Sequence, residues 1–198
     1  MLIAVFTKKA KDFITDLELI DAIARKDQQA LETLYDRYSK LLYTLILRIV
    51  RSPAEAEDIL QELYLQVWHK ANMFYSVRGN LSTWLMTLAR NRAIDHLRSK
   101  SHRERILRGP EGELLAVSDQ TIYANPLLLL EANEAGNIVR SALRKLSKSQ
   151  RDMLELAYYE GLSQSEIASK SGTPLGTVKT RMRKAMLTLK GSLMKYRR

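Results

Sequence analysis

The stretch GLSQSEIASKSGTP, residues 161–174, determines the fold of the second half of the chain. Ser163, followed by Glu166 three residues later, forms the capping-box pattern that begins a short helix. Gly172 can take the positive φ that ends this helix, and Pro174 suits the first position of another. The stretch therefore predicts two helices joined by a tight glycine turn, which is a helix-turn-helix.

The second of these helices is strongly basic. Residues 174–198 contain eight Lys or Arg and no Asp or Glu, and Thr173 is the predicted N-cap. Apolar residues recur at steps of three and four, so one face can pack on a core while the other offers cations and small side chains to a DNA major groove. A solvated basic surface helix is the alternative, but the glycine turn before it favours DNA binding. The predicted inward residues are Ile167, Ala168, Leu175, Val178, Met182, Ala185, Met186, Leu189 and Leu193, and the outward ones are Gly176, Thr177, Thr180, Arg183, Lys184 and Leu187, flanked by Lys179 and Arg181.

Composition excludes several classes of protein. The 198 residues include no Cys, so there is no disulfide framework, thiolate nucleophile or Cys-based zinc site. The longest apolar run, residues 41–47, is too short to cross a bilayer, and residues 1–6 lack the pattern of a signal peptide. We therefore expect a cytoplasmic protein.

The net charge of +10 favours a polyanionic partner. Residues 127–198 carry 14 basic and 6 acidic side chains, whereas residues 1–101 carry 15 and 12. The excess charge therefore lies in the helix-turn-helix half. A membrane surface would also attract a basic amphipathic helix, but the apolar stripe contains no Trp or Phe and is typical of a core-facing surface.

The periodicity predicts an all-α protein of two small helical domains joined by a flexible linker. Residues 102–125 contain Gly109-Pro110 and show no lasting helical period, so we interpret them as the linker. If both domains contact DNA, the linker lets them occupy separated sites on one duplex. Binding of one domain then raises the effective concentration of the other and so the overall affinity. Helical periods run through residues 16–26, 28–51, 53–73, 80–100, 126–147, 149–160, 163–171 and 174–196.

The predicted third helix, residues 53–73, has an apolar residue on its polar face. Its inward stripe is Ala56, Ile59, Leu60, Leu63 and Val67, and Leu65 falls almost opposite to it. A lone exposed Leu is common and usually has no function. On an acidic and polar face, it is alternatively the apolar centre of a protein-binding patch.

Residues 73–80, before the predicted fourth helix, combine aromatic rings, a cation and an amide in a loop that Gly79 can bend. Such a loop suits splayed-out single-stranded bases. The helix itself, residues 80–100, is either a mostly enclosed core helix with a local Arg92–Asp95 pair or a nucleic-acid surface.

Together these segments resemble the extracytoplasmic-function (ECF) sigma factors, the small two-domain members of the bacterial sigma-70 family. The likeness covers residues 16–101 and 126–196 in the family's order. The stretches that show the likeness are ALETLYDRY (30–38), DILQELYLQVW (58–68), NLSTWL (80–85), RNRAIDHLR (90–98) and the helix-turn-helix ending GTVKTR (176–181).

The resemblance implies that residues 16–101 form region 2, which binds the clamp helices of core RNA polymerase and opens the −10 promoter element. It implies that residues 126–198 form region 4, which binds the polymerase flap and reads the −35 element of promoter DNA. Residues 102–125 are then the linker, and residues 1–15 are an N-terminal extension that matches nothing in the family. An anti-sigma factor is a further partner that the family implies.

The resemblance also implies roles for three sets of residues. The set that binds core polymerase is Asp58, Gln61, Glu62, Leu65 and Gln66. The −10 set is Phe74, Tyr75, Arg78, Asn80, Trp84, Arg90, Asn91 and Arg98, in which Trp84 stands alone where housekeeping sigma factors have paired aromatics for melting. The −35 set is Thr177, Lys179, Thr180, Arg181, Arg183 and Lys184.

Two other functions are weighed against this one. A dimeric helix-turn-helix regulator that acts without polymerase explains residues 126–198 but gives the first half and Leu65 no role. An enzyme is the weakest reading, because the three His residues lack metal-ligand spacing and there is no nucleophile arrangement or phosphate loop. We therefore expect no catalytic residue, metal, cofactor or small-molecule substrate.

Overall fold

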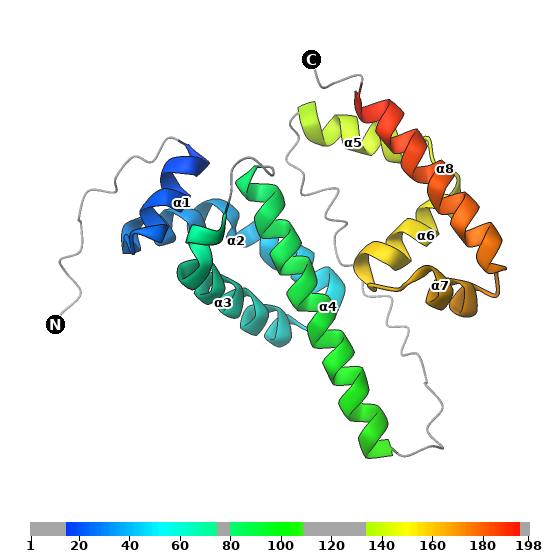
Figure 1. Cartoon of the computed structure of the whole chain (residues 1–198), viewed down its shortest axis with the longest axis horizontal. Coiled ribbons are helices and arrows are strands. Elements are labelled where there is room, and N and C mark those ends of the chain that lie inside the picture. The colour runs from blue at the N-terminus through cyan, green and yellow to red at the C-terminus, as the bar shows by residue number, and fades with distance from the viewer. Residues whose placement is uncertain (1–14, 75–79, 109–133, 195–198) are drawn as a thin grey trace. The chain divides into compact units, whose positions relative to one another are not determined.

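The structure, a computed structural model, describes residues 15–74, 80–108 and 134–194, and within these ranges every regular element is a helix (Figure 1). The all-α prediction is confirmed. No helix among them is long and apolar enough to cross a membrane. The elements are α1 (Asp16–Ala24), α2 (Gln28–Val50), α3 (Pro53–Lys70), the 3-10 turn η1 (Ala71–Met73), α4 (Leu81–Arg108), α5 (Glu134–Arg144), α6 (Lys148–Tyr159), α7 (Gln164–Ser171) and α8 (Leu175–Met194).

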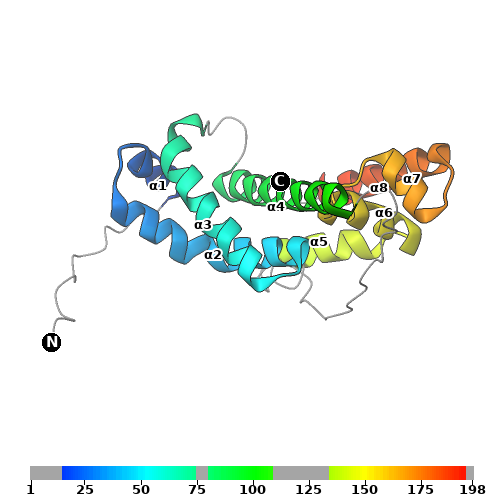
Figure 2. The ribbon, with the colours of Figure 1, turned by 90° about the horizontal axis from the view of Figure 1, so that it is seen from below.

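The chain divides into two compact units, residues 1–95 and 96–198. In the first unit α2 and α3 pack along each other, and α1 lies against α2, α3 and η1 (Figure 2). The buried side chains Leu19, Ile23, Leu34 and Leu63 fill the space between these helices. The core of this unit is therefore built from the apolar stripes that helical periodicity predicts.

Polar contacts fix the start of α1 against the middle of α2. The carboxylate of Asp16 accepts hydrogen bonds from the Arg37 guanidinium at 2.7 Å and the Tyr38 hydroxyl at 2.6 Å. Burial and the neighbouring Asp16 carboxylate raise the pKa of the Tyr38 hydroxyl, which stays protonated and donating. The chain thus enters the first unit beside α2.

The turn into α2 is fastened to the far end of α3. Lys26 has a positive φ of 65°, and its ammonium donates to the Trp68 carbonyl at 2.5 Å and lies 5.0 Å from the centre of the Trp68 ring. At the other end of α2, Ser52 caps α3, and Pro53 is its first residue, where the missing amide hydrogen costs nothing.

Helix α4 is longer than the sequence interpretation allows. It runs to Arg108 and takes in the first seven residues of the segment predicted as a linker, 102–108. These residues contain no Gly or Pro and include good helix formers, so nothing ends the helix before Gly109-Pro110. The predicted start of the next helix, residues 126–133, lies outside the described residues, and that helix, α5, ends at Arg144 instead of residue 147.

In the second unit α8 packs against α5, α6 and α7. Ile167 of α7 and Val178 of α8 are fully buried, and Met153 of α6 completes this cluster. Leu156 and Met182 pack around it. Helices α6, α7 and α8 thus share a small core that holds α7 and α8 at a fixed angle, and α5 packs on α8 (Figure 1).

Candidate functional site

The start of α7 has the geometry that residues 161–174 predict. The Glu166 amide donates to the Ser163 hydroxyl at 3.3 Å, and the Ser163 amide donates to the Glu166 carboxylate at 2.7 Å. Hydrogen bonds from the Ser163 side chain and backbone amide to the Glu166 carboxylate favour its ionised form and lower the pKa of Glu166 below its usual value. The capping box is confirmed.

The glycine turn after α7 is also confirmed. Gly172 has a φ of 61° and an amide that bonds back to the Ala168 carbonyl. The Thr173 amide donates to the same carbonyl at 3.2 Å, so both amides serve to end α7. A left-handed residue is needed here because the chain reverses within two residues.

The start of α8 differs from the prediction by one residue. The helix begins at Leu175, and the Pro174 carbonyl accepts from the amides of Thr177 and Val178 at 2.8 and 3.1 Å. The predicted N-cap, Thr173, instead donates its hydroxyl to the Ser171 carbonyl at 3.4 Å. The reason is that Thr173 belongs to the end of α7, which places the cap position at Pro174.

The apolar stripe of α8 is narrower than predicted. Val178 and Ala185 are buried, but Met186 is 58% exposed. Leu175 and Leu193, at 39% and 37%, lie at the edge. The neighbouring helices cover the arc centred on Val178 and Ala185, and Met186 falls about 100° from Ala185. The prediction that Met186 faces inward is therefore wrong.

The opposite face of α8 is cationic and open. Lys179, Thr180, Arg183 and Lys184 are exposed, while Thr177 and Arg181 are half-buried at its border. The Thr180 hydroxyl donates to the Gly176 carbonyl at 2.8 Å, which leaves its lone pairs directed outward. Because α8 contains no acidic residue, this face carries only positive charge, as a DNA-reading helix requires.

The exposed face of α3 carries the five residues predicted to bind polymerase. They fall within an arc of about 140°; Asp58, Gln61, Glu62 and Leu65 are exposed, and Gln66 is half-buried. Leu65 has 60% of its surface exposed and lies opposite the buried stripe. The prediction that Leu65 stands on a polar, outward face is confirmed.

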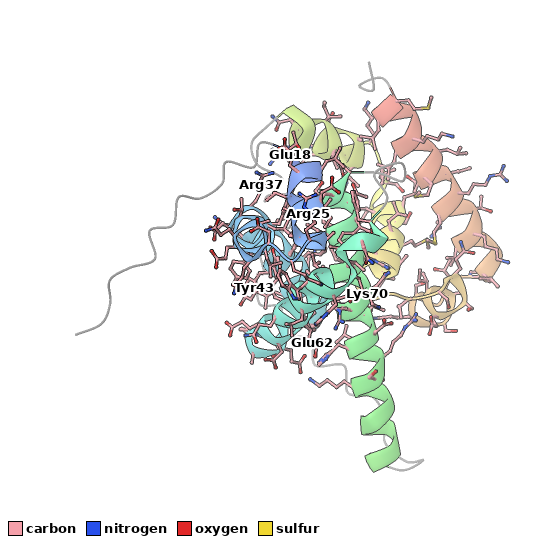
Figure 3. The ribbon with its side chains drawn as sticks, turned by 60° about the vertical axis from the view of Figure 1, so that its left-hand side comes forward. Glu18, Arg25, Arg37, Tyr43, Glu62 and Lys70 are labelled. Carbon is pink, nitrogen blue, oxygen red and sulfur yellow. The ribbon has the colours of Figure 1, made fainter. Side chains whose placement is uncertain are left out.

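One edge of this α3 face is held by Arg92 of α4. The Arg92 guanidinium donates to Glu62 at 2.5 Å and to Gln66 at 2.6 Å, and Glu62 lies where α3 approaches α4 (Figure 3). The predicted local pair of Arg92 with Asp95 is replaced by these contacts. Sequence spacing gave no signal for them, since they join residues 26 and 30 positions apart.

The other edge of the α3 face borders a groove that the sequence did not reveal. This α2–α3 groove has a volume of about 530 Å³ and is lined by apolar and aromatic side chains. Tyr35 falls on the apolar stripe of α2 by its helical spacing, yet it is 47% exposed at the groove wall, with the centre of its ring 4.9 Å from that of Tyr64. The lining is Gln28, Leu31, Tyr35, Gln61, Tyr64, Leu65 and Trp68.

The predicted −10 residues are only partly described. Tyr75 and Arg78 lie outside the described residues. The Phe74 ring meets the Trp84 ring edge-on, with centroids 5.5 Å apart. The Asn80 side-chain oxygen accepts from the Thr83 amide at 2.9 Å and caps α4, so a base contact by Asn80 would use its amide nitrogen.

On α4, three of the −10 candidates share one stripe. Trp84, Asn91 and Arg98 are spaced by seven residues, within about 40° of one another, and Asn91 and Arg98 are exposed. Arg90 falls about 100° away from Asn91 and lies beside this stripe. Asn80, Trp84 and Asn91 therefore lie together, whereas Arg90 faces a different direction.

No group of three or more His, Asp or Glu among the described residues is placed to hold a metal ion. The described residues instead form three candidate binding surfaces. These are the cationic face of α8, the polar face of α3 with Leu65 at its centre, and the α4 stripe beside Phe74.

Residues 34–103 match the Sigma-70 region 2 family, and residues 136–189 match the family described as Sigma-70, region 4. The chain is 34% identical over 181 residues to the ECF RNA polymerase sigma factor SigK of Mycobacterium tuberculosis, covering 90% of this chain and 94% of that one. SigK of Mycobacterium sp. (strain JLS) is also 34% identical, over 183 residues, with 90% and 91% covered.

Solved structures with similarity include a chain of the RsbN–BldN complex, at 25% identity and a TM-score of 0.37, covering 86% of this chain and 96% of that one. Another comes from the complex of Rhodobacter sphaeroides SigE with the anti-sigma ChrR, at 28% identity and a TM-score of 0.45, with 88% and 96% covered. The two family matches fall on α2–α4 and α5–α8, the segments that carry the three surfaces. On the strength of those matches and of the SigK relatives, this chain belongs to the ECF RNA polymerase sigma factors.

Proposed function

We propose that residues 16–101 act as the region that binds core polymerase and the −10 element, and residues 126–198 as the region that reads the −35 element. The observation that carries this proposal is the pairing of two unlike surfaces on one chain. One is the purely cationic face of α8, and the other is the exposed face of α3, which places Leu65 among polar and acidic side chains. A DNA-binding regulator needs only the first.

The face of α8 supports a role in reading promoter DNA. Arg183 and Lys184 are exposed within about two and a half turns of the helix start. Their cations can reach guanine O6 and N7 in a major groove, while Lys179 and Arg181 flank the face and suit phosphates. The proposed −35 set is therefore Thr177, Lys179, Thr180, Arg181, Arg183 and Lys184.

The face of α3 supports a role in binding the clamp helices of core polymerase. An interface core is typically apolar with a polar rim, and Leu65 is surrounded by Asp58, Gln61 and Glu62 on this face. Gln66 and Glu62 are held by Arg92 and so present fixed geometry to a partner. We assign the flap contact to residues 126–198 as a whole.

The α4 stripe supports capture of an unstacked −10 base. Trp84 and Phe74 provide aromatic surfaces next to the amide of Asn80, which is the combination that stacks a base and pairs with its edge. Asn91 and Arg98 continue the same stripe toward the phosphate backbone. The assignments of Tyr75, Arg78 and Arg90 rest on the family resemblance.

We infer that the chain is a cytoplasmic factor and not an enzyme, because the polymerase supplies the chemistry of RNA synthesis. Its partners are core polymerase, promoter DNA and an anti-sigma factor, as the family implies. SigE of Rhodobacter sphaeroides was solved with the anti-sigma ChrR.

The test is assembly with core polymerase. The purified full chain, mixed with core enzyme, should co-elute with it in gel filtration, and the chain alone should elute as a monomer. A stable dimer that binds an operator tightly and does not join core enzyme would instead support the dimeric regulator. Sequencing RNA 5′ ends after overexpression would identify the promoters.

A further inference from the structure

The α2–α3 groove is an apolar patch between the outer faces of two helices whose other apolar residues are buried in the core. Leu65 and Tyr35 on its walls are 60% and 47% exposed, and Leu31 and Trp68 extend the lining. Exposed apolar surface rimmed by polar residues is typical of a binding site. Two of the lining residues, Gln61 and Leu65, also belong to the face proposed to bind core polymerase.

The N-terminal extension has the composition of a segment that binds such a groove. Residues 1–6 are MLIAVF, six apolar residues in a row, and neither the family matches nor the proposed function gives them a role. Residues 7–14 follow with three Lys and one Asp. The extension is thus an apolar end joined to a basic stem.

The position of α1 brings this end within reach of the groove. Asp16 is fixed to Tyr38 on α2, and Tyr38 is about 4.5 Å along the helix axis from Tyr35 at the groove wall. Residues 7–15 span up to about 30 Å when extended. That length is enough to carry residues 1–6 along the whole groove.

The charge around the groove complements the stem. Glu32 and Asp36 on α2 and Asp58 on α3 are exposed on the helices that form its walls. Three Lys within residues 7–14 would lie among these carboxylates when residues 1–6 occupy the groove. Because these charges are exposed to solvent, the attraction between the Lys side chains and the carboxylates is weak. It orients the segment and decreases with added salt.

We propose that residues 1–6 of the chain dock in the α2–α3 groove and cover Gln61 and Leu65, so that the N-terminal extension competes with core polymerase for this face. The docking stands on the groove itself, whereas the competition rests on the proposed function. The apparent affinity for polymerase then falls with the fraction of chains in which the groove is open.

Disulfide trapping tests the docking, because the chain has no Cys to interfere. In the full chain, Ala4→Cys is combined with Gln28→Cys on the groove rim, and as a control with Ala54→Cys, which is exposed at the opposite end of α3. Docking predicts an intramolecular disulfide that forms at least about fivefold faster in the first pair. Equal rates in the two pairs would overturn the proposal, and so would a dimer-sized product, which would assign the groove to a second copy.

Polymerase affinity tests the competition. Ile3→Asp places a charge in the apolar end and should lower the apparent Kd for core polymerase roughly threefold to tenfold, as expected if the docked state is populated in two-thirds to nine-tenths of chains. Ile3→Leu, which keeps the same position apolar, is the matched control and should change it little. An unchanged Kd in Ile3→Asp would overturn the competition. Failure of every variant to bind polymerase would overturn the proposed function and the competition with it, while the disulfide still decides the docking.

Discussion

Individual side chains on the outward face of α8 differ in how far they lie from its N-terminal end. Arg183 and Lys184 are exposed near that end, and Lys190 is about 9 Å further along the axis. Only the first part of a recognition helix reaches base edges. We therefore expect side chains near the start of α8 to contact base edges. Side chains further along should contact phosphates or make no DNA contact.

We predict that Arg183→Ala and Lys184→Ala weaken promoter recognition by about 1–3 kcal/mol each and relax the preference at one −35 base pair. Lys190→Ala is the control and should do little, or weaken all promoters alike and reduce the salt slope by about one. The measurement is transcription from a panel of −35 variants by each mutant holoenzyme at two salt concentrations. If Arg183→Ala and Lys184→Ala left both the preference and the promoter strength unchanged, α8 would not be the reader.

Gly176 and Gly191 make a matched pair on the same face of α8. A Cβ added at either position meets no atom within 4 Å, so replacement by Ala should leave the fold intact and stabilise it by up to about 1 kcal/mol. Gly176→Ala adds bulk where we place the DNA, and it should weaken −35 recognition. Gly191→Ala, about 22 Å further along, should not.

Urea unfolding and promoter binding by the holoenzyme, measured on both Gly variants, separate these effects. Loss of stability in Gly176→Ala would show that the helix start is strained, and equal effects of the two variants on promoter binding would contradict our placement of the DNA.

Among the elements, α3 has two unlike faces. Its buried stripe packs on the first unit, and the face around Leu65 remains exposed. We predict that Leu65→Ala changes the free energy of unfolding by no more than about 0.5 kcal/mol, as is usual for an exposed site, and weakens core-polymerase binding by about 1 kcal/mol or more.

Leu17→Ala is the control for this prediction, since Leu17 on α1 is 50% exposed and outside the proposed polymerase face. A pull-down on core enzyme and circular dichroism, run on both variants, decide the outcome. Helicity and binding lost together in Leu65→Ala would mean that Leu65 is a core residue. Glu62→Lys would also be expected to weaken polymerase binding, but it is a less direct probe because it removes one partner of Arg92.

Helix identity and local capping could be predicted from the sequence, because both depend on neighbours within four residues. The Ser163–Glu166 box and the left-handed Gly172 are of this kind. Contacts between elements could not be predicted in the same way. Arg92 bonds to α3 instead of Asp95, and Tyr35 opens onto a groove, because both depend on where another helix lies.

Where a helix ends also depends on factors other than apolar periodicity, namely helix propensity and the cover that neighbouring helices provide. The α4 helix continues through residues 102–108 because polar residues without Gly or Pro extend a helix although they add no apolar stripe. The stripe of α8 is narrower than predicted because α5, α6 and α7 cover only part of it, which leaves Met186 exposed.

At the scale of the whole molecule, our proposal is that core polymerase binds the −10 and −35 regions together and so sets their spacing on the promoter. The chain alone should therefore bind duplex DNA weakly and with little sequence preference, through the cationic face of α8. We expect neither the −10 surface nor the −35 surface to bind DNA specifically by itself. Specific affinity should arise when core polymerase holds both surfaces on one promoter.

Run-off transcription tests this account most directly. Core polymerase with the full chain should initiate specifically at a promoter identified from its 5′ ends, while core polymerase alone should not, and the chain alone should show only weak, salt-sensitive DNA binding. Tight, sequence-specific binding by the chain alone at physiological salt, with no promoter-specific transcript when core polymerase is added, would contradict the account.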